Sequence, residues 1–238
     1  MSEYDPGAFP PFAVTVDVVV LTVSDVFEVL LVERGADPYA GMLALPGGFV
    51  LENESLDVAA RRELVEETGI DSEALPGVFF EQLATFGEPD RDPRMRVVSV
   101  TYLGIGRFRP DPTAGTDAAG ARWVPVDEAL RAELAFDHGH ILATAVERAR
   151  AKLEYTTVAT AFAGDDFTLG DLHAIYETVW GERLDLANFR RKVLATKGFV
   201  EATGERRVSA AGGAPAAVYR VGGGATLSPP LVRERSTG

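Results

Sequence analysis

Apolar positions in the first two thirds of the chain follow two different spacings. Runs of β-branched and aliphatic residues bounded by turn-forming residues are typical of strands, and they occur at 15–21, 26–33, 78–86, 96–105 and 123–125. Apolar residues three or four positions apart, with capping residues at the ends, predict helices at 55–68, 126–134 and 138–155. Strands and helices mixed without strict alternation predict an α+β sandwich.

The pattern changes after residue 155. A helix that Gly181 closes is predicted by apolar positions at helical spacing, namely Leu172, Ile175, Tyr176, Val179 and Trp180. A second helix follows Asp185, and apolar runs at 199–201 and 217–221 predict two strands around a loop. Two helices joined by a short turn and followed by a β hairpin form a winged helix-turn-helix plan.

The length of the chain indicates two domains. The chain has 238 residues, more than one typical domain needs, and it has no cysteine. It contains no apolar run long enough to span a membrane and no basic-then-apolar N-terminal segment. We therefore expect a cytoplasmic protein without disulfides or membrane spans.

Charge is distributed unevenly between the two parts. The net charge of −13 argues by itself against a nucleic-acid partner, because phosphate binding needs clustered basic residues. Residues 1–154, however, hold 13 Lys and Arg against 27 Asp and Glu, while residues 155–238 hold 10 against 9. The second part is thus close to neutral, and its basic residues gather at 190–192 and 206–207. The charge of the whole chain does not exclude DNA binding by this part.

One stretch carries the candidate chemistry, and it runs from Gly48 to Ile70 as GFVLENESLDVAARRELVEETGI. Glu54 follows Gly48 after five residues, and Arg62-Glu63 begins after seven more. Every specified position of the pattern Gx5Ex7REUxEExGU, where U is aliphatic, is filled. This pattern is the Nudix box, and so long a gapped motif predicts the Nudix fold, an α/β/α sandwich.

The spacing of the box explains its chemistry. In a helix, Glu63 lies one turn from both Glu66 and Glu67, so the three carboxylates gather on one side. Hard oxygen ligands suit Mg²⁺ or Mn²⁺, which would offset their repulsion. We predict a metal site at Glu63, Glu66, Glu67 and Gly48, with the same glutamates as catalytic groups if the box is active. A solvated acidic helix face is the alternative, and the upstream Gly48 and Glu54 favour the site.

The second helix of the C-terminal part is the candidate DNA-reading element. In a winged helix it would enter the major groove, where Arg can bind guanine and Asn can bind adenine through two hydrogen bonds each. The residues that would face bases and phosphates are Asn188, Arg190, Arg191 and Lys192, with Arg206 and Arg207 on the wing. The alternative is a small α+β appendage that mediates dimerisation.

The whole chain resembles the Nudix-related transcriptional regulators of NAD metabolism, the NrtR family. The resemblance spans roughly residues 14–221, and its most specific part is the helix motif Asn188-Phe189-Arg190-Arg191-Lys192. Other matching stretches are 15–20, 30–35, 43–50, 86–94, 152–156 and Phe167-Thr168-Leu169. The resemblance implies a Nudix domain at 12–155, a winged helix at 156–222 and a tail at 223–238. It also implies that Thr168 contacts the DNA. That tail is rich in Gly, Pro and charge, so we expect disorder there.

The resemblance also implies a function. Family members are homodimeric repressors that bind a palindromic DNA operator near NAD-biosynthesis genes and are released by ADP-ribose or a related NAD metabolite. In the wing, this chain has Gly213-Ala214-Pro215-Ala216 where family members tend to have Gly-Arg-Pro-Ala. This departure puts one wing contact of the family in doubt, and Arg206 and Arg207 are the candidates to replace it.

The second hypothesis is a Mg²⁺-dependent Nudix hydrolase of the ADP-ribose pyrophosphatase type, with a C-terminal dimerisation module. The complete box supports it, although Thr85 stands where dedicated ADP-ribose pyrophosphatases usually have a proline. Arg91, Arg94 and Arg96 are candidate phosphate ligands under either hypothesis, because guanidinium groups match phosphate oxygens. A base outside the box would come from the acids Glu128, Glu133 or Asp137.

Overall fold

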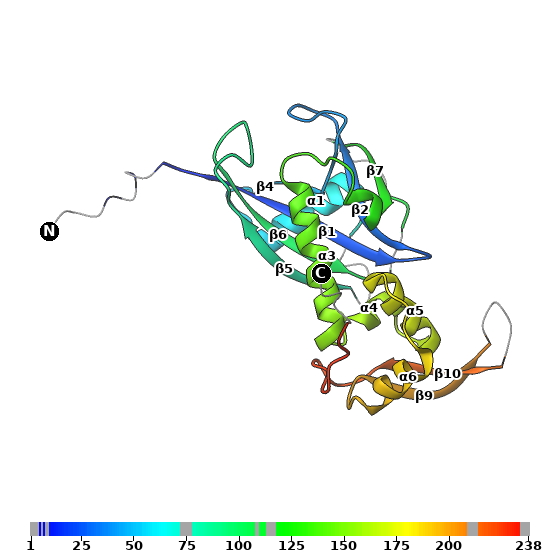
Figure 1. The fold of residues 1–238 in the computed structure, drawn as a ribbon. Coiled ribbons are helices and arrows are strands. Elements are labelled where there is room, and N and C mark those ends of the chain that lie inside the picture. Colours follow the sequence, from blue (N-terminus) through cyan, green and yellow to red (C-terminus); the bar gives the residue numbers. More distant parts are fainter. Residues whose placement is uncertain are drawn as a thin grey trace.

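The structure, a computed structural model, describes residues 5, 7, 10–71, 78–107, 110–112, 118–208 and 214–233. Within these residues, seven strands form one mixed sheet (Figure 1). The strands are β1 (Ala13–Val23), β2 (Phe27–Arg34), β3 (Leu43–Ala44), β4 (Gly47–Phe49), β5 (Phe79–Phe86), β6 (Val97–Ile105) and β7 (Ala118–Pro125).

Strand β1 lies at the centre of this sheet. It pairs in parallel with β6 over nine positions, from Ala13 to Leu21, and antiparallel with β2 and β4. Every residue from Thr15 to Thr22 is buried, because helices cover both faces of the sheet. A strand covered on both faces needs apolar side chains at nearly every position, which explains the continuous run in the sequence.

Helix α1 (Leu56–Thr68) covers one face. The Ser55 side chain caps it by accepting from the Val58 N–H, and Gly69 ends it in the left-handed conformation at φ 69°. Ala59, Ala60 and Leu64 pack against the side chains of β1 that point to this face. The cap and the stop agree with the predicted bounds and fix where the box glutamates lie.

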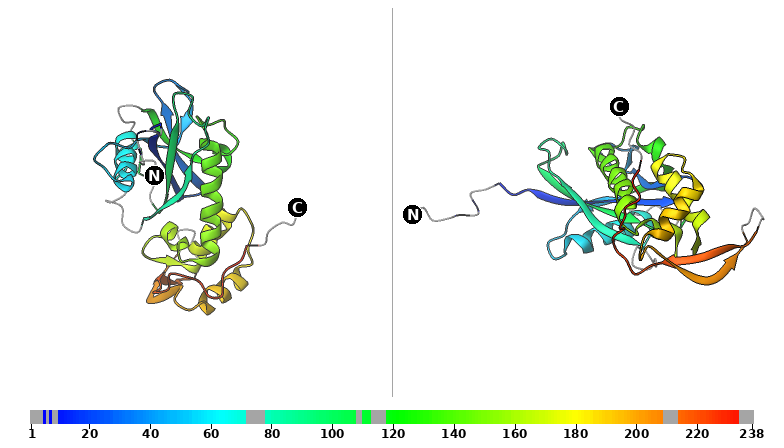
Figure 2. Two further views of the ribbon diagram at one scale, coloured as in Figure 1. Left: turned by 90° about the vertical axis from the view of Figure 1, so that its left-hand side faces the viewer. Right: turned by 60° about the horizontal axis from the view of Figure 1, so that its bottom comes forward.

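Helix α3 (His138–Tyr155) covers the other face, and its apolar residues continue into the C-terminal domain. The winged helix consists of α4 (Ala159–Ala163), β8 (Phe167–Thr168), α5 (Leu169–Trp180), α6 (Leu186–Ala195), β9 (Val200–Arg207) and β10 (Ala216–Val221). One cluster of buried side chains includes Phe27 of the sheet, Ile141 of α3 and Tyr176 of α5. The two domains therefore share one continuous core, and Figure 2 shows α3 extending from the sheet to the winged helix.

Local signals in the winged helix also agree with the sequence. Thr168 and Asp171 form a capping box at the start of α5, and Gly181 ends that helix at φ 72°. The Asp185 side chain caps α6 by accepting from the Asn188 N–H at 2.7 Å. Strand order β8-β10-β9 places β10 in the middle of the small sheet, where it contacts α5.

The structure differs from the predictions in several places, and the short strands β3, β4 and β8 were not predicted. Helix α2 (Val126–Ala129) is shorter than the predicted 126–134, β7 begins at Ala118 and not at Trp123, and α4 was not predicted. The predicted disordered tail is packed in its described part, since Leu227 and Leu231 are each only 3% exposed. Residues 234–238 lie outside the described residues. In the described part of the chain, no helix is long and apolar enough to cross a membrane.

Candidate functional site

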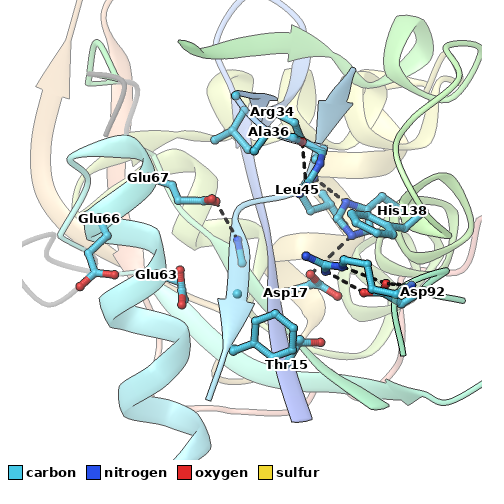
Figure 3. Close-up of a pocket in the computed structure, with 18 of the residues that line it drawn as sticks. Thr15, Asp17, Arg34, Ala36, Leu45, Glu63, Glu66, Glu67, Asp92 and His138 are labelled. Atoms are coloured by element: carbon cyan, nitrogen blue, oxygen red, sulfur yellow. Dashed lines mark hydrogen bonds and ion pairs between the residues drawn. The ribbon is translucent and has the colours of Figure 1, made fainter. Parts of the chain in front are cut away.

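The Nudix box lines a cleft of about 620 Å³ (Figure 3). Its walls come from β1, the β2–β3 loop, β4, α1, the β5–β6 loop and the residues that begin α3. The polar side chains among its lining residues are Thr15, Asp17, Glu33, Arg34, Asp37, Arg62, Glu63, Glu66, Glu67, Arg91, Asp92, Arg94 and His138. Acidic groups from α1 thus face arginines from the loops.

Arg62 organises the acidic wall. Its guanidinium donates to Glu54 at 2.6 Å, to Glu63 at 2.7 Å and to Glu66 at 2.9 Å. Its hydrogen bonds hold the pKa of Glu54 down at about 2, while burial raises the pKa of Glu63. The arginine of the box therefore neutralises carboxylates that would otherwise repel one another.

The two glycines before the box helix allow β4 to approach these carboxylates closely. A Cβ atom on Gly48 would lie 2.4 Å from Glu63 Oε1, and one on Gly47 would lie 2.3 Å from the backbone oxygen of Val16. The Gly47 N–H donates to Glu67 Oε2 at 2.9 Å. Burial nevertheless raises the pKa of Glu67 to about 7.

The donor atoms of the predicted metal site are of the right chemistry. Carboxylate oxygens of Glu63, Glu66 and Glu67 all border the cleft, and a proton on Glu67 could be replaced by a cation. Among the described residues, however, no three acidic or imidazole side chains converge on one point. Glu66 turns toward Arg62. Metal binding at this site stays a prediction.

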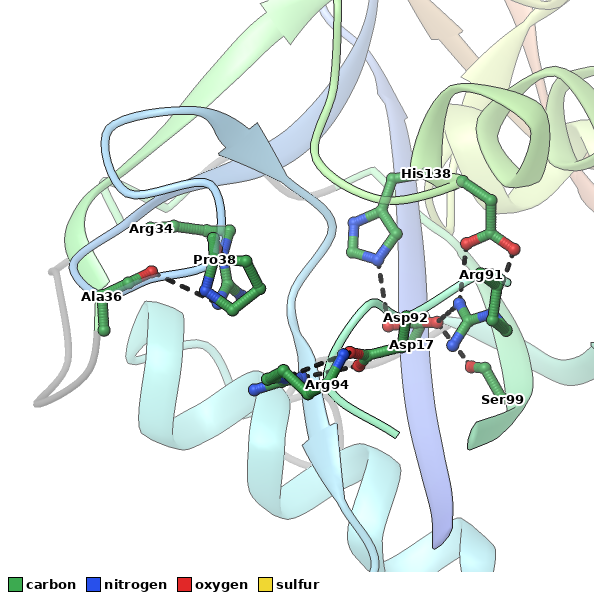
Figure 4. Close-up of polar contacts among 10 residues, drawn as sticks. Asp17, Arg34, Ala36, Pro38, Arg91, Asp92, Arg94, Ser99 and His138 are labelled. Carbon is green, nitrogen blue, oxygen red and sulfur yellow. Dashed lines mark hydrogen bonds and ion pairs between the residues drawn. The ribbon is translucent and has the colours of Figure 1, made fainter. Parts of the chain in front are cut away.

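A network of buried charges forms part of the cleft lining, and Figure 4 shows its contacts. Arg91 binds Asp137 through two hydrogen bonds of 2.7 and 3.0 Å and lies 3.3 Å from Asp17, whose carboxylate also accepts from Ser99. His138 Nδ1 accepts the Leu45 N–H at 2.9 Å. Because Nδ1 accepts this hydrogen bond, the ring proton is on Nε2, which lies 3.5 Å from Asp17. Burial lowers the pKa of His138.

The three predicted ligand arginines therefore differ in position. Arg91 borders the cleft, but its side chain is only 4% exposed and its guanidinium is held by the two aspartates. Arg96 does not line the cleft and donates to the backbone oxygens of Gly87 and Glu88. Only Arg94 lines the cleft with a substantially exposed side chain, while it pairs with Asp92 at 2.7 Å.

Arg34 and Phe136, which the site prediction omitted, line the cleft together with Arg94. The guanidinium carbon atoms of Arg34 and Arg94 lie 4.8 and 5.6 Å from the centre of the Phe136 ring. Tyr39 makes an edge contact with the same ring at 4.8 Å, and both Tyr39 and Phe136 have positive φ. Residues with such backbone conformations are frequent at functional sites, yet no sequence pattern marks them. Arg34 lies in one of the stretches that resemble the NrtR family.

The acids considered as an outside base do not occupy a catalytic position in the described residues. Asp137 is paired with Arg91, and Glu128 and Glu133 are exposed and do not line the cleft. Among the described residues that follow Arg94 in the chain, no acidic side chain lines the cleft. The three box glutamates remain its acidic groups, together with Asp17, Glu33, Asp37 and Asp92.

The predicted DNA face of the winged helix is exposed. Asn188, Arg190, Arg191 and Lys192 are all exposed on α6, while Phe189 between them is buried in the core. Arg191 donates to Asn188 Oδ1 at 2.7 Å. This pair presents a side-chain amide and a guanidinium side by side on the exposed face of α6, while the Asp185 carboxylate binds only the backbone N–H of Asn188.

The other predicted DNA residues have structural contacts as well. Thr168 accepts the Asp171 N–H with its side chain and so caps α5. Arg206 and Arg207 lie on exposed strand β9, where they donate to the backbone oxygens of Pro215 and Asp166. Gly213 of the altered wing motif lies outside the described residues.

Comparison with known proteins finds a family match for each of the two domains. The NUDIX domain family matches residues 11–145, and the NrtR DNA-binding winged helix domain matches residues 161–221. The ADPR responsive transcriptional repressor NtrR of Acinetobacter baylyi is 34% identical over 223 residues, which cover 92% of this chain and 86% of that protein.

Solved structures agree with this assignment. Shewanella oneidensis NrtR complexed with a 27mer DNA has 33% identity and a TM-score of 0.74, over 87% of this chain and 93% of that chain. The NUDIX domain of the same protein complexed with ADP ribose has 36% identity and a TM-score of 0.55, over 62% of this chain and 95% of that chain. The chain therefore belongs to the NrtR family of Nudix-related transcriptional regulators, in which a Nudix domain precedes a DNA-binding winged helix.

Proposed function

We propose that the protein is a DNA-binding transcriptional repressor of NAD biosynthesis or salvage genes, and that its Nudix domain senses ADP-ribose or a related NAD metabolite. The observation that carries the proposal is the presence, in one chain, of a nucleotide-sized cleft and an exposed basic recognition helix. The relatives in Acinetobacter and Shewanella support it by their response to ADP-ribose and their binding of DNA.

The cleft suits such an effector chemically. A diphosphate needs guanidinium groups, and Arg94 offers one at the cleft surface beside the more buried Arg34. The Phe136 ring that both contact is an apolar surface for a ring of the nucleotide. Arg91 then acts mainly as a support that holds the β5–β6 loop against Asp17 and Asp137.

The recognition helix suits a DNA operator. Helix α6 would lie in the major groove, with Asn188, Arg190, Arg191 and Lys192 directed at bases and phosphates and Arg206 and Arg207 of the wing at the backbone. A homodimer would place two such helices on the half-sites of a palindrome. Binding of the effector would release the DNA by favouring a dimer geometry that does not fit it.

An electrophoretic mobility shift tests this function. The probe is the DNA upstream of the protein's own gene, at a fixed and stated salt concentration, with and without ADP-ribose. We expect a specific shift with the free protein and its loss with ADP-ribose. The absence of any specific shift at moderate salt would exclude the regulator.

One observation also favours a second activity, the hydrolysis of ADP-ribose. The box is complete, and Glu63, Glu66 and Glu67 all border the cleft. With Gly48 they would hold a Mg²⁺ or Mn²⁺ ion, which would supply charge neutralisation at the pyrophosphate and help to activate a water. Arg62 would keep the glutamates in place, and Arg94 would bind a phosphate.

This activity is tested by Mg²⁺-dependent release of AMP from ADP-ribose. Glu66→Gln should abolish any turnover, because it removes one metal-ligand charge, and should leave operator binding intact. Glu66 is half-exposed and pairs only with Arg62 among the contacts of its side chain, so its replacement should not disturb the fold. Equal loss of both functions would show that the carboxylate is structural.

A further inference from the structure

The segment after β10 returns from the wing to the Nudix domain. The Leu227 N–H donates to the Tyr155 oxygen at 2.8 Å, and the Leu231 N–H donates to the Glu154 oxygen at 2.9 Å. Both leucine side chains are 3% exposed and belong to the same core cluster as Phe189 of α6. We call residues 225–233 the C-terminal strap, which lies beside the end of α3 in Figure 2.

A crossing of two backbones fixes the start of the strap. The Gly222 N–H donates to the Phe199 oxygen at 2.8 Å, and the Gly224 N–H donates to the Gly198 oxygen at 2.9 Å. A Cβ atom on Gly222 would lie 2.4 Å from the Gly198 oxygen, whereas a Cβ atom on Gly223 would have nothing within 4 Å. The crossing therefore requires glycine at 222 and leaves 223 free to change.

A group of charges fixes the other end. Arg233 donates to Glu147 at 3.0 Å, and its Nε lies 3.5 Å from Oε1 of Glu154 as an ion pair without hydrogen-bond geometry. The Glu154 side chain is 1% exposed. A buried carboxylate without a compensating charge is strongly destabilising, so Arg233 both holds the strap and compensates Glu154.

Between these two ends the strap contacts the recognition helix. The hydroxyl of Thr196, the C-terminal cap of α6, donates to the Lys192 oxygen at 2.9 Å within the helix and lies 3.4 Å from the Pro229 oxygen of the strap. A small cavity of about 60 Å³ separates Leu231 of the strap from Asn188 and Lys192 of α6. The strap thus lies along the edge of α6 that carries two of the predicted DNA contacts.

We propose that the C-terminal strap is a positioning element for operator binding, which holds helix α6 at a fixed angle against the end of α3. Base contacts in a groove require side chains held within a fraction of an ångström and about 10–20° of their working geometry. Gly222 and Arg233 are in this view positioning residues that act through α6 and do not contact DNA. The inference rests on the proposed function, since it presupposes an operator.

The test compares Gly222→Ala with its neighbour Gly223→Ala, and Arg233→Gln with the double variant Glu154→Gln/Arg233→Gln, all in the full-length chain. Three quantities are measured: the Kd for the upstream DNA fragment, the Kd for ADP-ribose by calorimetry, and Tm. We expect Gly222→Ala and Arg233→Gln to raise the DNA Kd about tenfold, and Gly223→Ala to change it less than about twofold. ADP-ribose affinity should not change in any variant.

The double variant separates positioning from stability. It removes the buried carboxylate that Arg233→Gln leaves unpaired, so it should recover Tm, but the strap stays released and the DNA Kd stays raised. Recovery of both Tm and DNA affinity would overturn the proposal, as would wild-type DNA affinity in Gly222→Ala and Arg233→Gln. If the wild-type chain gives no specific shift, the proposed function fails and this inference fails with it.

Discussion

The Gly47 N–H and the Glu67 carboxylate are joined by a 2.9 Å hydrogen bond, yet burial raises the pKa of Glu67 to about 7. The folded protein thus holds a proton on Glu67 that the unfolded chain releases near pH 4.5. The stability contributed by this proton is fully present below pH 4.5 and is lost as pH rises through 7.

Glu67→Gln should remove this pH dependence, because glutamine can still accept the Gly47 N–H without a charge. The unfolding free energy of the variant minus that of the wild type should increase by up to about 3 kcal/mol when the pH is raised from 4.5 to 8. Urea denaturation at the two pH values, with a chelator present, measures the difference. A constant difference between the two proteins would mean that Glu67 is ionised throughout.

The two glycines of β4 should differ in their tolerance of alanine. A Cβ on Gly47 would meet the backbone of Val16, which cannot move, so Gly47→Ala should cost about 2 kcal/mol or more of stability. A Cβ on Gly48 would meet the carboxylate of Glu63, which can rotate away. Gly48→Ala should therefore fold, with a disturbed Glu63–Arg62 pair. Thermal denaturation of both variants checks the order, which equal losses would contradict.

Arg94 and Arg96 provide a matched pair for effector binding, because they are two residues apart and only Arg94 lines the cleft. Arg94→Gln should weaken ADP-ribose binding by about 1.5–3 kcal/mol, the range for a hydrogen bond to a charged group. Arg96→Gln should leave it nearly unchanged. Isothermal titration calorimetry measures both, and an equal effect of the two substitutions would remove Arg94 from the site.

Arg191→Ala should weaken operator binding by about 1–3 kcal/mol if Arg191 reads a base. The control is Arg131→Ala, which removes the same charge from an exposed position of the Nudix domain. Binding is measured at several salt concentrations, because loss of a phosphate contact alone would mainly lower the salt dependence. Unchanged affinity for Arg191→Ala would show that α6 does not enter the groove.

The sequence predicted the elements whose signals are local. Helix α1 has a capping serine and a terminal glycine at the expected places, and α3 has a clear apolar period. Helix α2 ends at Ala129, and in the turn that follows it the N–H groups of Arg131 and Ala132 both donate to the Glu128 oxygen. The tail was judged by composition, whereas two leucines four residues apart anchor its described part.

The cleft could be predicted only in part, because only some of its contacts are local in the sequence. The box spacing locates the glutamates, but the partners of an arginine lie far along the chain. Arg91 binds Asp17, 74 positions away, and Asp137, 46 positions away, so a phosphate ligand and a structural cation look alike in the sequence. The packing of the β5–β6 loop decides which of the three arginines is available.

The length of α3 limits how an effector can act on DNA. Its 18 residues span about 27 Å, from His138 under the cleft to the strap beside the winged helix. Charges in water are screened beyond about 8 Å at physiological salt. The proposed release of DNA by a nucleotide in the cleft therefore cannot rest on electrostatic repulsion through water, and it requires a displacement of packed helices.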